Sequence, residues 1–187
     1  MRCFLAVPLR DPALTEAQRL LASLRERIAG VRWARPETLH ITVHFFGSIP
    51  DDDVRRALDA VSPVASSARA GEVTLDTLGS FPPHGWPRVL WLGCKQEPAG
   101  VVELAHGCRE VLHQAGFEVE TRRYRAHCTL GRPRVPWSSA GRAAWDAARA
   151  DGWPASTFVA ERLVLYESHP GAGGSRYELH TSLQLSA

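Results

Sequence analysis

Hydrophobic residues recur along the chain with two different spacings, and each spacing predicts one kind of element. Apolar residues at every second position, or in uninterrupted blocks of four to eight, predict strands, whereas apolar residues three or four positions apart predict helices. Strands are predicted over residues 2–9, 31–33, 37–46, 72–81, 89–93, 117–121, 125–132, 157–167 and 176–185. Helices are predicted over residues 11–29, 50–62, 98–115 and 138–150.

Residues that cap or break helices mark the ends of these segments. Asp11 is predicted to cap the first helix, and Gly30 to end it. Pro63 is predicted to stop the second helix, since proline removes a backbone donor. Ser138 or Ser139 is suited to cap the last helix. A glycine-rich turn over residues 169–174 is expected before the closing strand.

The order of the elements predicts an α+β fold. Helices interspersed with hairpins favour antiparallel sheets over a doubly wound parallel sheet. A chain of 187 residues is suited to one compact domain with an ample core. Its two halves follow a similar order of strand, helix, strand, helix and hairpin, so we expect one domain, residues 1–187, built of two lobes.

Two predicted strands carry the same polar pattern within an apolar run. One contains His40 and Thr42, and the other contains His127 and Thr129. Side chains of a strand alternate between its faces, so the histidine and threonine of each strand share one face. The opposite faces are apolar and comprise Leu39, Ile41, Val43 and Phe45 in the first strand, and Ala126, Cys128 and Leu130 in the second. Each strand therefore has a polar face that could form one side of a functional site and an apolar face that could lie in the core.

The tripeptide alone is weakly specific, and its surroundings carry more of the inference. About one His-x-Ser/Thr is expected by chance in this composition, and three occur, the third beginning at His180. His180 alternates with Glu178 and Ser182 on what we interpret as a solvated outer face. In the two threonine-bearing copies, a distinctive side chain follows the histidine by five positions, Phe45 in one and Arg132 in the other.

Composition excludes several classes of protein. The net charge is only +2, which is not that of a polybasic protein that coats nucleic acid, and Lys95 is the only lysine beside many arginines. The four cysteines form no CxxC pair and have no metal-finger spacing, and without a recognisable signal peptide they are expected to be reduced thiols in the cytoplasm. No apolar run approaches the length of a membrane span, and the first residues do not have the pattern of a signal peptide. We expect a cytoplasmic protein that does not bind membranes.

The residue types on the two polar faces predict acid–base chemistry on a phosphate. Histidine titrates near neutrality, so a neutral imidazole can take a proton while a second, protonated imidazole gives one. Thr42 and Thr129 can donate hydrogen bonds to phosphate oxygens, and Arg132 can stabilise the charge of the transition state.

Several neighbouring residues are further candidates for contact with a substrate. His44 is expected on the same face as His40, and one of Phe45 and Phe46 is expected in the core while the other stacks on a base. Three arginines before the second motif could guide RNA phosphates, namely Arg122, Arg123 and Arg125, although a solvated run of charges accounts better for at least two of them.

Two alternative functions share these residues. A protein that binds RNA ends without turnover would use the same two polar strand faces. A metal-dependent hydrolase would use His40, His44 and His127, although no carboxylate lies on those strand faces.

The two strands resemble the paired HxTx signatures of the 2H phosphoesterase superfamily, and in particular its RNA 2′,3′-cyclic phosphodiesterases, also called 2′-5′ RNA ligases. The resemblance extends over nearly the whole chain. It includes the opening strand, Trp33 before the first motif, Tyr124 to Ala126 before the second, and the closing segments 165–168 and 176–179.

The resemblance implies a bilobal fold in which two antiparallel-sheet lobes, with outer helices, face a central cleft, and each lobe supplies one HxTx strand. It implies hydrolysis of a 2′,3′-cyclic phosphate at an RNA end to a 2′-phosphomonoester, with His40 as proton donor and His127 as proton acceptor. Thr42, Thr129 and Arg132 would bind the phosphate, and Phe45, Phe46, His44, Tyr124 and Arg125 are candidates for other substrate contacts. No metal or other cofactor is implied, and we expect a monomer whose partner is RNA with a cyclic phosphate end.

Overall fold

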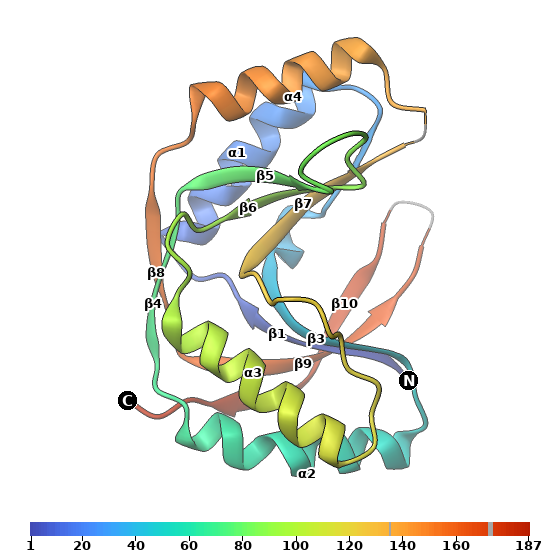
Figure 1. Ribbon diagram of the computed structural model, residues 1–187, viewed down its shortest axis with the longest axis vertical. Coiled ribbons are helices and arrows are strands. Elements are labelled where there is room, and N and C mark those ends of the chain that lie inside the picture. The colour runs from blue at the N-terminus through green and yellow to red at the C-terminus, as the bar shows by residue number, and fades with distance from the viewer. Residues whose placement is uncertain (135, 172–173) are drawn as a thin grey trace.

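The computed structural model of the protein describes residues 1–134, 136–171 and 174–187 and has an α+β architecture (Figure 1). Its elements in chain order are β1 (Arg2–Pro8), α1 (Ala13–Arg27), β2 (Val31–Trp33), a 3₁₀ turn (Pro36–Thr38), β3 (His40–Ser48), α2 (Asp51–Ser67), β4 (Gly71–Leu75), β5 (Thr77–Phe81), β6 (Val89–Gly93), α3 (Ala99–Gln114), β7 (His127–Pro133), α4 (Ser139–Asp151), β8 (Ser156–Ala160), β9 (Arg162–His169) and β10 (Arg176–Gln184).

Most of the strands form one antiparallel sheet in the order β10-β9-β1-β3-β7-β6-β5, with β2 paired to β7 beside β3. The two motif strands, β3 and β7, are neighbours in its centre. They share one pair of opposed residues, Ile41 and Cys128. The sheet therefore has two halves, β10-β9-β1-β3 and β7-β6-β5 with β2, which meet at the two strands that carry the motifs.

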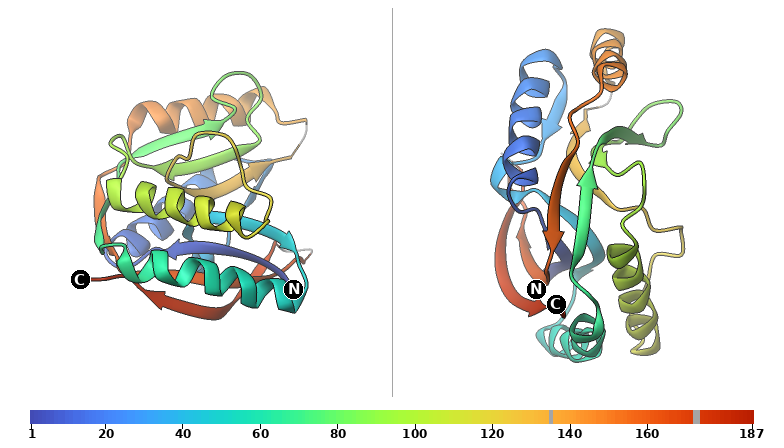
Figure 2. Two further views of the ribbon diagram at one scale, coloured as in Figure 1. Left: turned by 60° about the horizontal axis from the view of Figure 1, so that its bottom comes forward. Right: turned by 90° about the vertical axis from the view of Figure 1, so that its left-hand side faces the viewer.

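The helices are divided between these two halves. α2 and α3 contact each other, and they contact β10 and β3 respectively, whereas α1 contacts β2 and α4 contacts β5. Figure 2 shows α1 and α4 beside one half of the molecule and α2 and α3 beside the other. α3 comes just before β7 in the chain but packs against β3. The position of a helix in the sequence therefore does not show which half of the sheet it covers.

The core is built from the apolar faces of β1, β3 and β7 and the apolar sides of the helices. Leu5, Ile41, Leu21 and Leu112 are among its fully buried side chains. Removal of this apolar surface from water is the main favourable contribution to folding. The apolar spacing in the sequence predicts these helices and strands correctly in kind and approximate position.

Two predicted strands, 72–81 and 157–167, are each divided in the structure. The first breaks at Asp76 into β4 and β5, and the second breaks at Glu161 into β8 and β9. In both, the earlier part forms the separate two-stranded sheet β4–β8, and the later part joins the main sheet. The break at Asp76 is stabilised locally, because its carboxylate accepts a hydrogen bond of 2.7 Å from the Lys95 N–H.

The structure contradicts the predictions for Pro63, for residues 117–121 and for Asp11. Pro63 lies inside α2 rather than at its end, because burial of Val61 and Ala65 favours the final helical turn despite the missing donor. Residues 117–121 form no strand, since the Phe117 ring instead packs against Phe46.

Asp11 does not occupy the cap position of α1, which is Pro12, but its carboxylate accepts hydrogen bonds from the N–H and hydroxyl of Thr15. Ser138 does cap α4, where its hydroxyl accepts a hydrogen bond from the Gly141 N–H. The turn expected over residues 169–174 lies partly outside the described residues.

Candidate active site

The structure brings the histidine and threonine of both motifs onto one face of the central strands. Ile41 and Cys128 are opposite each other and fully buried, so the residues on either side of them point to the other face. Because the two strands run in opposite directions, the residue before Ile41 lies beside the residue after Cys128, and the residue after Ile41 lies beside the residue before Cys128. His40 is therefore beside Thr129, and His127 beside Thr42, with approximate twofold symmetry.

Both imidazoles are oriented in the same way. His40 Nδ1 lies 2.6 Å from the carbonyl oxygen of Thr38, and His127 Nδ1 lies 2.7 Å from the carbonyl oxygen of Arg125. A carbonyl can only accept, so Nδ1 carries the proton in each ring. The Nε2 atom of each neutral histidine is therefore left as the free base or, once protonated, the free donor.

Burial lowers the pKa of both histidines. The pKa of His40 falls to about 4, mainly through burial, while the Thr38 carbonyl opposes the change and the nearby His127 adds to it. The pKa of His127 is lowered by burial and then by the charges of Arg132 and Arg125, against the raising effects of the Arg125 carbonyl and Glu97. Both rings are consequently neutral in the free protein at pH 7, and an anion bound between them would raise both pKa values.

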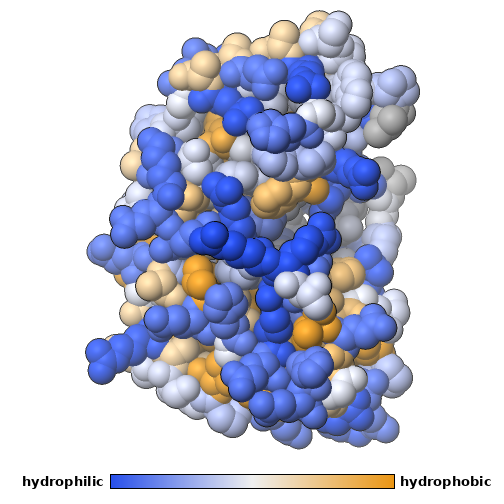
Figure 3. All heavy atoms as spheres, viewed as in Figure 1, coloured by the Kyte–Doolittle hydropathy of each residue, from blue (hydrophilic) through white to orange (hydrophobic). Residues whose placement is uncertain are grey.

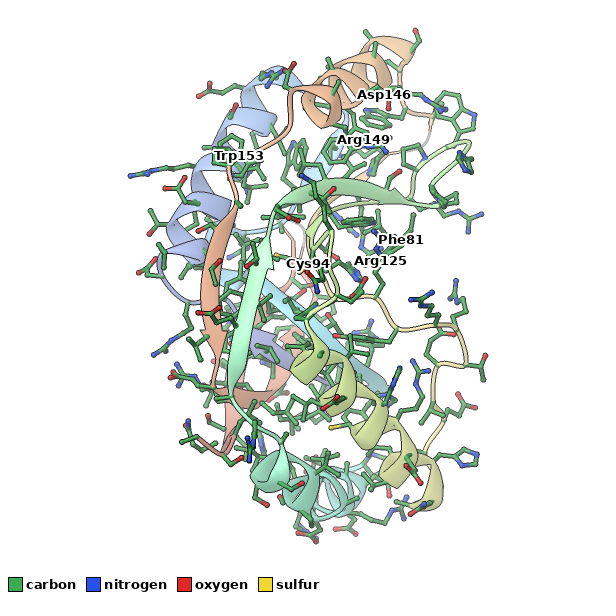
Figure 4. All side chains as sticks on the ribbon, turned by 60° about the vertical axis from the view of Figure 1, so that its left-hand side comes forward. Phe81, Cys94, Arg125, Asp146, Arg149 and Trp153 are labelled. Carbon is green, nitrogen blue, oxygen red and sulfur yellow. The ribbon has the colours of Figure 1, made fainter. Side chains whose placement is uncertain are left out.

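Different aromatic residues surround the two histidines. The His40 ring centroid lies 4.8 Å from that of Phe4 on β1 and 5.4 Å from that of Tyr177 on β10. The His127 centroid lies 5.0 Å from that of Phe81 and 6.2 Å from that of Trp91. Phe81 and Arg125 both contact the Trp91 ring, and they lie near one another in Figure 4.

Each motif strand has a bulge three positions after its histidine. Thr42 and His44 face consecutive residues of β1, so Val43 is an extra residue in β3, and Phe46 is a second one further along the strand. Thr129 and Gly131 likewise face consecutive residues of β6, so Leu130 is the extra residue in β7. A bulge reverses the alternation of side chains beyond it.

The bulges bring the fifth residue after each histidine onto the face that carries the motifs. In β3 this residue is Phe45, which is 51% exposed and lies opposite Phe4, a neighbour of His40. In β7 it is Arg132, which is exposed and whose charge acts on His127. Regular alternation predicts Phe45 among the apolar residues on the other face, and that prediction is wrong because the bulge intervenes.

The same bulge moves His44 away from His40, which corrects the expectation that they share a face. His44 is only 8% exposed, and its ring contacts Phe46 with centroids 4.5 Å apart. Burial, followed by the charge of Arg109, lowers the pKa of His44 to about 4. Phe46 in turn packs against Phe117, so Phe46 belongs to the core and Phe45 to the site face.

The three-histidine metal set considered from the sequence is not assembled, because His44 points away from the other two. Among the residues that the structure describes, three metal-ligating side chains gather only at Glu167, His169 and Glu178, on β9 and β10. Glu167 is opposite Cys3, whose side chain is on the core side of β1, so this group is not on the face of the two catalytic candidates.

The two remaining substrate-contact candidates have partners within the protein. The Tyr124 hydroxyl donates a hydrogen bond of 3.0 Å to the Thr42 carbonyl, which links the segment before β7 to β3. The Arg125 guanidinium lies over the Trp91 ring, 4.7 Å from its centroid, and its Nε is 3.6 Å from a Glu97 oxygen.

Sequence reasoning does not find Arg32 and Glu97. Arg32 on β2 is opposite Arg132 and is exposed, so a second arginine joins the site face. Its alternation with Val31 and Trp33 is visible in the sequence, but the strand with which it pairs is not. Glu97 lies in the turn between β6 and α3, where no local pattern marks it.

One face of the molecule is strongly polar across its middle (Figure 3). Figure 3 shows strongly hydrophilic side chains across the middle of one face, between the β5–β6 half and α3. A separate hollow on α3, lined by His106, Arg109, Glu110, His113, Gln114 and Val119, does not include the motif residues.

Among the described residues, no helix has the length and apolar character needed to cross a membrane.

The chain is similar to known phosphoesterases in sequence and in fold. Residues 7–91 match the family model of LigT-like phosphoesterases. An RNA 2′,3′-cyclic phosphodiesterase of Archaeoglobus fulgidus is 33% identical over 132 residues, which cover 71% of this chain and 72% of that protein. One of Methanothermobacter thermautotrophicus is 31% identical over 136 residues, covering 73% of each. The chain belongs to the LigT-like phosphoesterases.

Solved structures show that this phosphoesterase has the fold of its family. A Thermus thermophilus protein superposes with a TM-score of 0.79 at 22% identity, over 99% of this chain and 98% of that one. Escherichia coli LigT in complex with 3′-AMP superposes with a TM-score of 0.76 at 20% identity, over 100% and 98%. The family match and the relatives confirm the resemblance to the 2H phosphoesterases, and the superpositions confirm the α+β fold class.

Proposed function

We propose that this phosphoesterase hydrolyses 2′,3′-cyclic phosphate ends of RNA to 2′-phosphomonoesters by acid–base catalysis with two histidines. One observation carries the proposal. His40 and His127 lie on one face of adjacent strands, each beside a threonine. Each has Nδ1 bound to a backbone carbonyl and an Nε2 without a hydrogen-bond partner among the described residues. The relatives named RNA 2′,3′-cyclic phosphodiesterases support the choice of substrate.

In the proposed mechanism, His127 Nε2 takes a proton from water as the water oxygen attacks phosphorus. The bond from phosphorus to the 3′ oxygen breaks, and protonated His40 donates its proton to that oxygen. The negative charge of the cyclic phosphate favours the protonated form of His40, which burial disfavours in the free protein. The phosphate stays on the 2′ oxygen.

Thr42 and Thr129 would hold the non-bridging oxygens, and Arg132 would stabilise the charge that develops on them. If the 5′-hydroxyl of a second RNA replaces water, His127 takes its proton as its oxygen attacks phosphorus, the 3′ oxygen leaves with the proton of His40, and a 2′-5′ linkage is formed. We also propose that the two halves of the sheet act as lobes of one catalytic domain in a monomer. Each half supplies one motif strand.

The test is turnover of a short RNA with a 2′,3′-cyclic phosphate end, followed by assignment of the phosphate position by ³¹P NMR. We expect His40→Ala and His127→Ala each to lower kcat by about 10²- to 10⁴-fold, the range for loss of a general acid or base. His180→Ala is the matched control, since His180 is exposed on β10 and also begins a His-x-Ser/Thr tripeptide. It should leave kcat unchanged.

EDTA should not change the rate, because among the described residues no three metal-ligating side chains gather at the two histidines. Near-wild-type turnover by either alanine variant would disprove the two-histidine mechanism. Binding of the cyclic-phosphate RNA without conversion would instead favour an RNA-end-binding protein.

A further inference from the structure

Glu97 connects the turn before α3 to the backbone that immediately precedes His127. Its Oε2 accepts a hydrogen bond of 2.9 Å from the Ala126 N–H, and its Oε1 lies 3.6 Å from Arg125 Nε. Ala126 is almost fully buried, and pairing of β7 with β6 begins only at the next residue, His127 opposite Gly93. Glu97 therefore supplies the acceptor for a buried donor at the point where the strand ladder starts.

These contacts hold the Arg125–Ala126 peptide on both sides. The Arg125 guanidinium is placed between Glu97 and the Trp91 ring, over which its Cζ lies 4.7 Å from the centroid. On the β6 side, a Cβ added to Gly93 would lie 3.1 Å from the Ala126 carbonyl oxygen, so the two backbones approach closely. The carbonyl of Arg125, fixed by this arrangement, accepts the Nδ1–H of His127 at 2.7 Å.

The other histidine has no equivalent carboxylate among the described groups that act on it. The carbonyl that orients His40 belongs to Thr38, which is held in a 3₁₀ turn by hydrogen bonds from its own N–H and hydroxyl to the Arg35 carbonyl. A local turn thus positions His40, whereas a side chain that is 29 residues away in the sequence positions the backbone of His127. This difference breaks the near symmetry of the two motifs.

The charges that face His127 also differ from those that face His40. Arg125 and Arg132 are on its own segment and strand, His40 is on β3, and Glu97 is the one carboxylate among the described groups that act on it. Arg32 on β2 is opposite Arg132, and the contacts from β5 and β6 are the uncharged rings of Phe81 and Trp91. A carboxylate beside these arginines favours the protonated imidazole, which a general base becomes when it takes a proton.

We propose that Glu97 is a positioning residue of this site, which fixes the peptide that orients the His127 imidazole and offsets the two arginines beside it. The inference rests on the proposed function, in which His127 is the base. Glu97 acts through the backbone and through its charge, and does not contact the reacting atoms.

Two substitutions separate the two parts of this role. Glu97→Gln keeps an oxygen acceptor for the Ala126 N–H but removes the charge, and Glu97→Ala removes both. Glu103→Gln is the matched control, because Glu103 is exposed on α3 and its substitution changes the net charge equally. The pKa of His127 is measured by NMR titration of its Cε1–H, assigned with His127→Ala, and kcat is measured from pH 4 to 9.

We expect Glu97→Gln to lower the pKa of His127 by roughly half a unit, the effect of a partly screened unit charge nearby. Because the base must be neutral, the acidic limb of the kcat profile should move to lower pH by the same amount. We expect Glu97→Ala to reduce kcat roughly ten- to hundredfold with little change in KM, as loss of orientation does. Glu103→Gln should match the wild type in both measurements.

The proposal is overturned if both Glu97 variants match Glu103→Gln in the His127 titration and in kcat. It is also overturned if Glu97→Ala loses activity only in proportion to its loss of folded protein, with the His127 titration unchanged in both variants. Lack of turnover by the wild type would contradict the proposed function, whereas the NMR titration would still test Glu97.

Discussion

At the scale of single residues, His40 and His44 show how the surroundings set the chemistry of one side chain. They are four positions apart on β3, and burial lowers the pKa of both to about 4. His40 Nδ1 has a carbonyl partner, and its ring is half-buried on the site face. The Nε2 of His44 is buried and has no hydrogen-bond partner among the described residues. His44 is therefore a group on which the stability of the protein depends, rather than a second acid or base.

This placement predicts a pH-dependent stability that belongs to His44. Its pKa is lower in the folded state than in the unfolded state, so between about pH 6.5 and 4 the unfolded chain binds more protons and stability falls as pH falls. The loss by pH 4.5 should be roughly 2–3 kcal/mol, at about 1.4 kcal/mol per unit.

We expect urea unfolding of His44→Leu at pH 7 and pH 4.5 to show a smaller difference than the wild type by about this amount. His106→Leu, on the exposed side of α3, is the control and should retain the wild-type difference. An unchanged pH dependence in His44→Leu would contradict the assignment. His40 titrates in all of these proteins and does not affect the comparison.

At the scale of elements, the bulges of β3 and β7 decide which side chains can reach a substrate. Regular alternation over the whole of β3 would place Phe45 with Ile41 in the core and His44 with His40. The bulge at Val43 instead places Phe45 on the face of His40, and His44 in the core. The bulge at Leu130 likewise places Arg132 on the face of His127. A two-residue period in the sequence predicts the strand but cannot show where an extra residue enters, because this depends on the register with the neighbouring strand.

This exchange predicts opposite effects for two adjacent phenylalanines. Phe45→Ala should raise KM for a cyclic-phosphate RNA about 5- to 100-fold, since loss of one base-stacking ring costs roughly 1–3 kcal/mol, and should change stability little. Phe46→Ala should lower the free energy of unfolding by a few kcal/mol with little change in KM, because Phe46 packs against Phe117 and His44. Steady-state kinetics and urea unfolding of the two variants check this. The reverse pattern would show that the bulge does not select the stacking residue.

At the scale of the whole molecule, two half-sheets meet along one pair of residues. Ile41 and Cys128 are fully buried, and each is flanked by the histidine and threonine of its motif. Burial of this pair places two segments 87 positions apart on a common face (127 − 40). The small β4–β8 sheet, at the side of the molecule in Figure 1, also connects the two halves of the chain.

This junction predicts that Ile41 supports activity as well as stability. Ile41→Ala and Ile28→Ala should each lower the free energy of unfolding by about 2–5 kcal/mol, because both side chains are fully buried. Only Ile41→Ala should also reduce kcat of the fully folded protein, since Ile28 is at the end of α1. Kinetics well below each variant's midpoint of thermal unfolding provide the measurement. Equal kcat in the two variants would contradict a role for the junction in aligning the histidines.

Local patterns in the sequence specify the kinds of elements, their approximate order and the two polar motifs that they carry. These features depend on the spacing of apolar residues and on the residue types within one segment. His40, Thr42, His127 and Thr129 are recognisable for this reason, and so is the resemblance to a family with paired HxTx motifs.

Only the folded chain determines how the two motifs pair and which residues contact them. The pairing of Ile41 with Cys128, the positions of the bulges, and the contacts of Glu97 and Arg32 join residues that are far apart in the chain. The division of residues 72–81 and 157–167 between two sheets has the same origin. Such contacts depend on the packing of the whole molecule, because hydrogen-bond partners and buried surfaces are supplied by segments that no local pattern specifies.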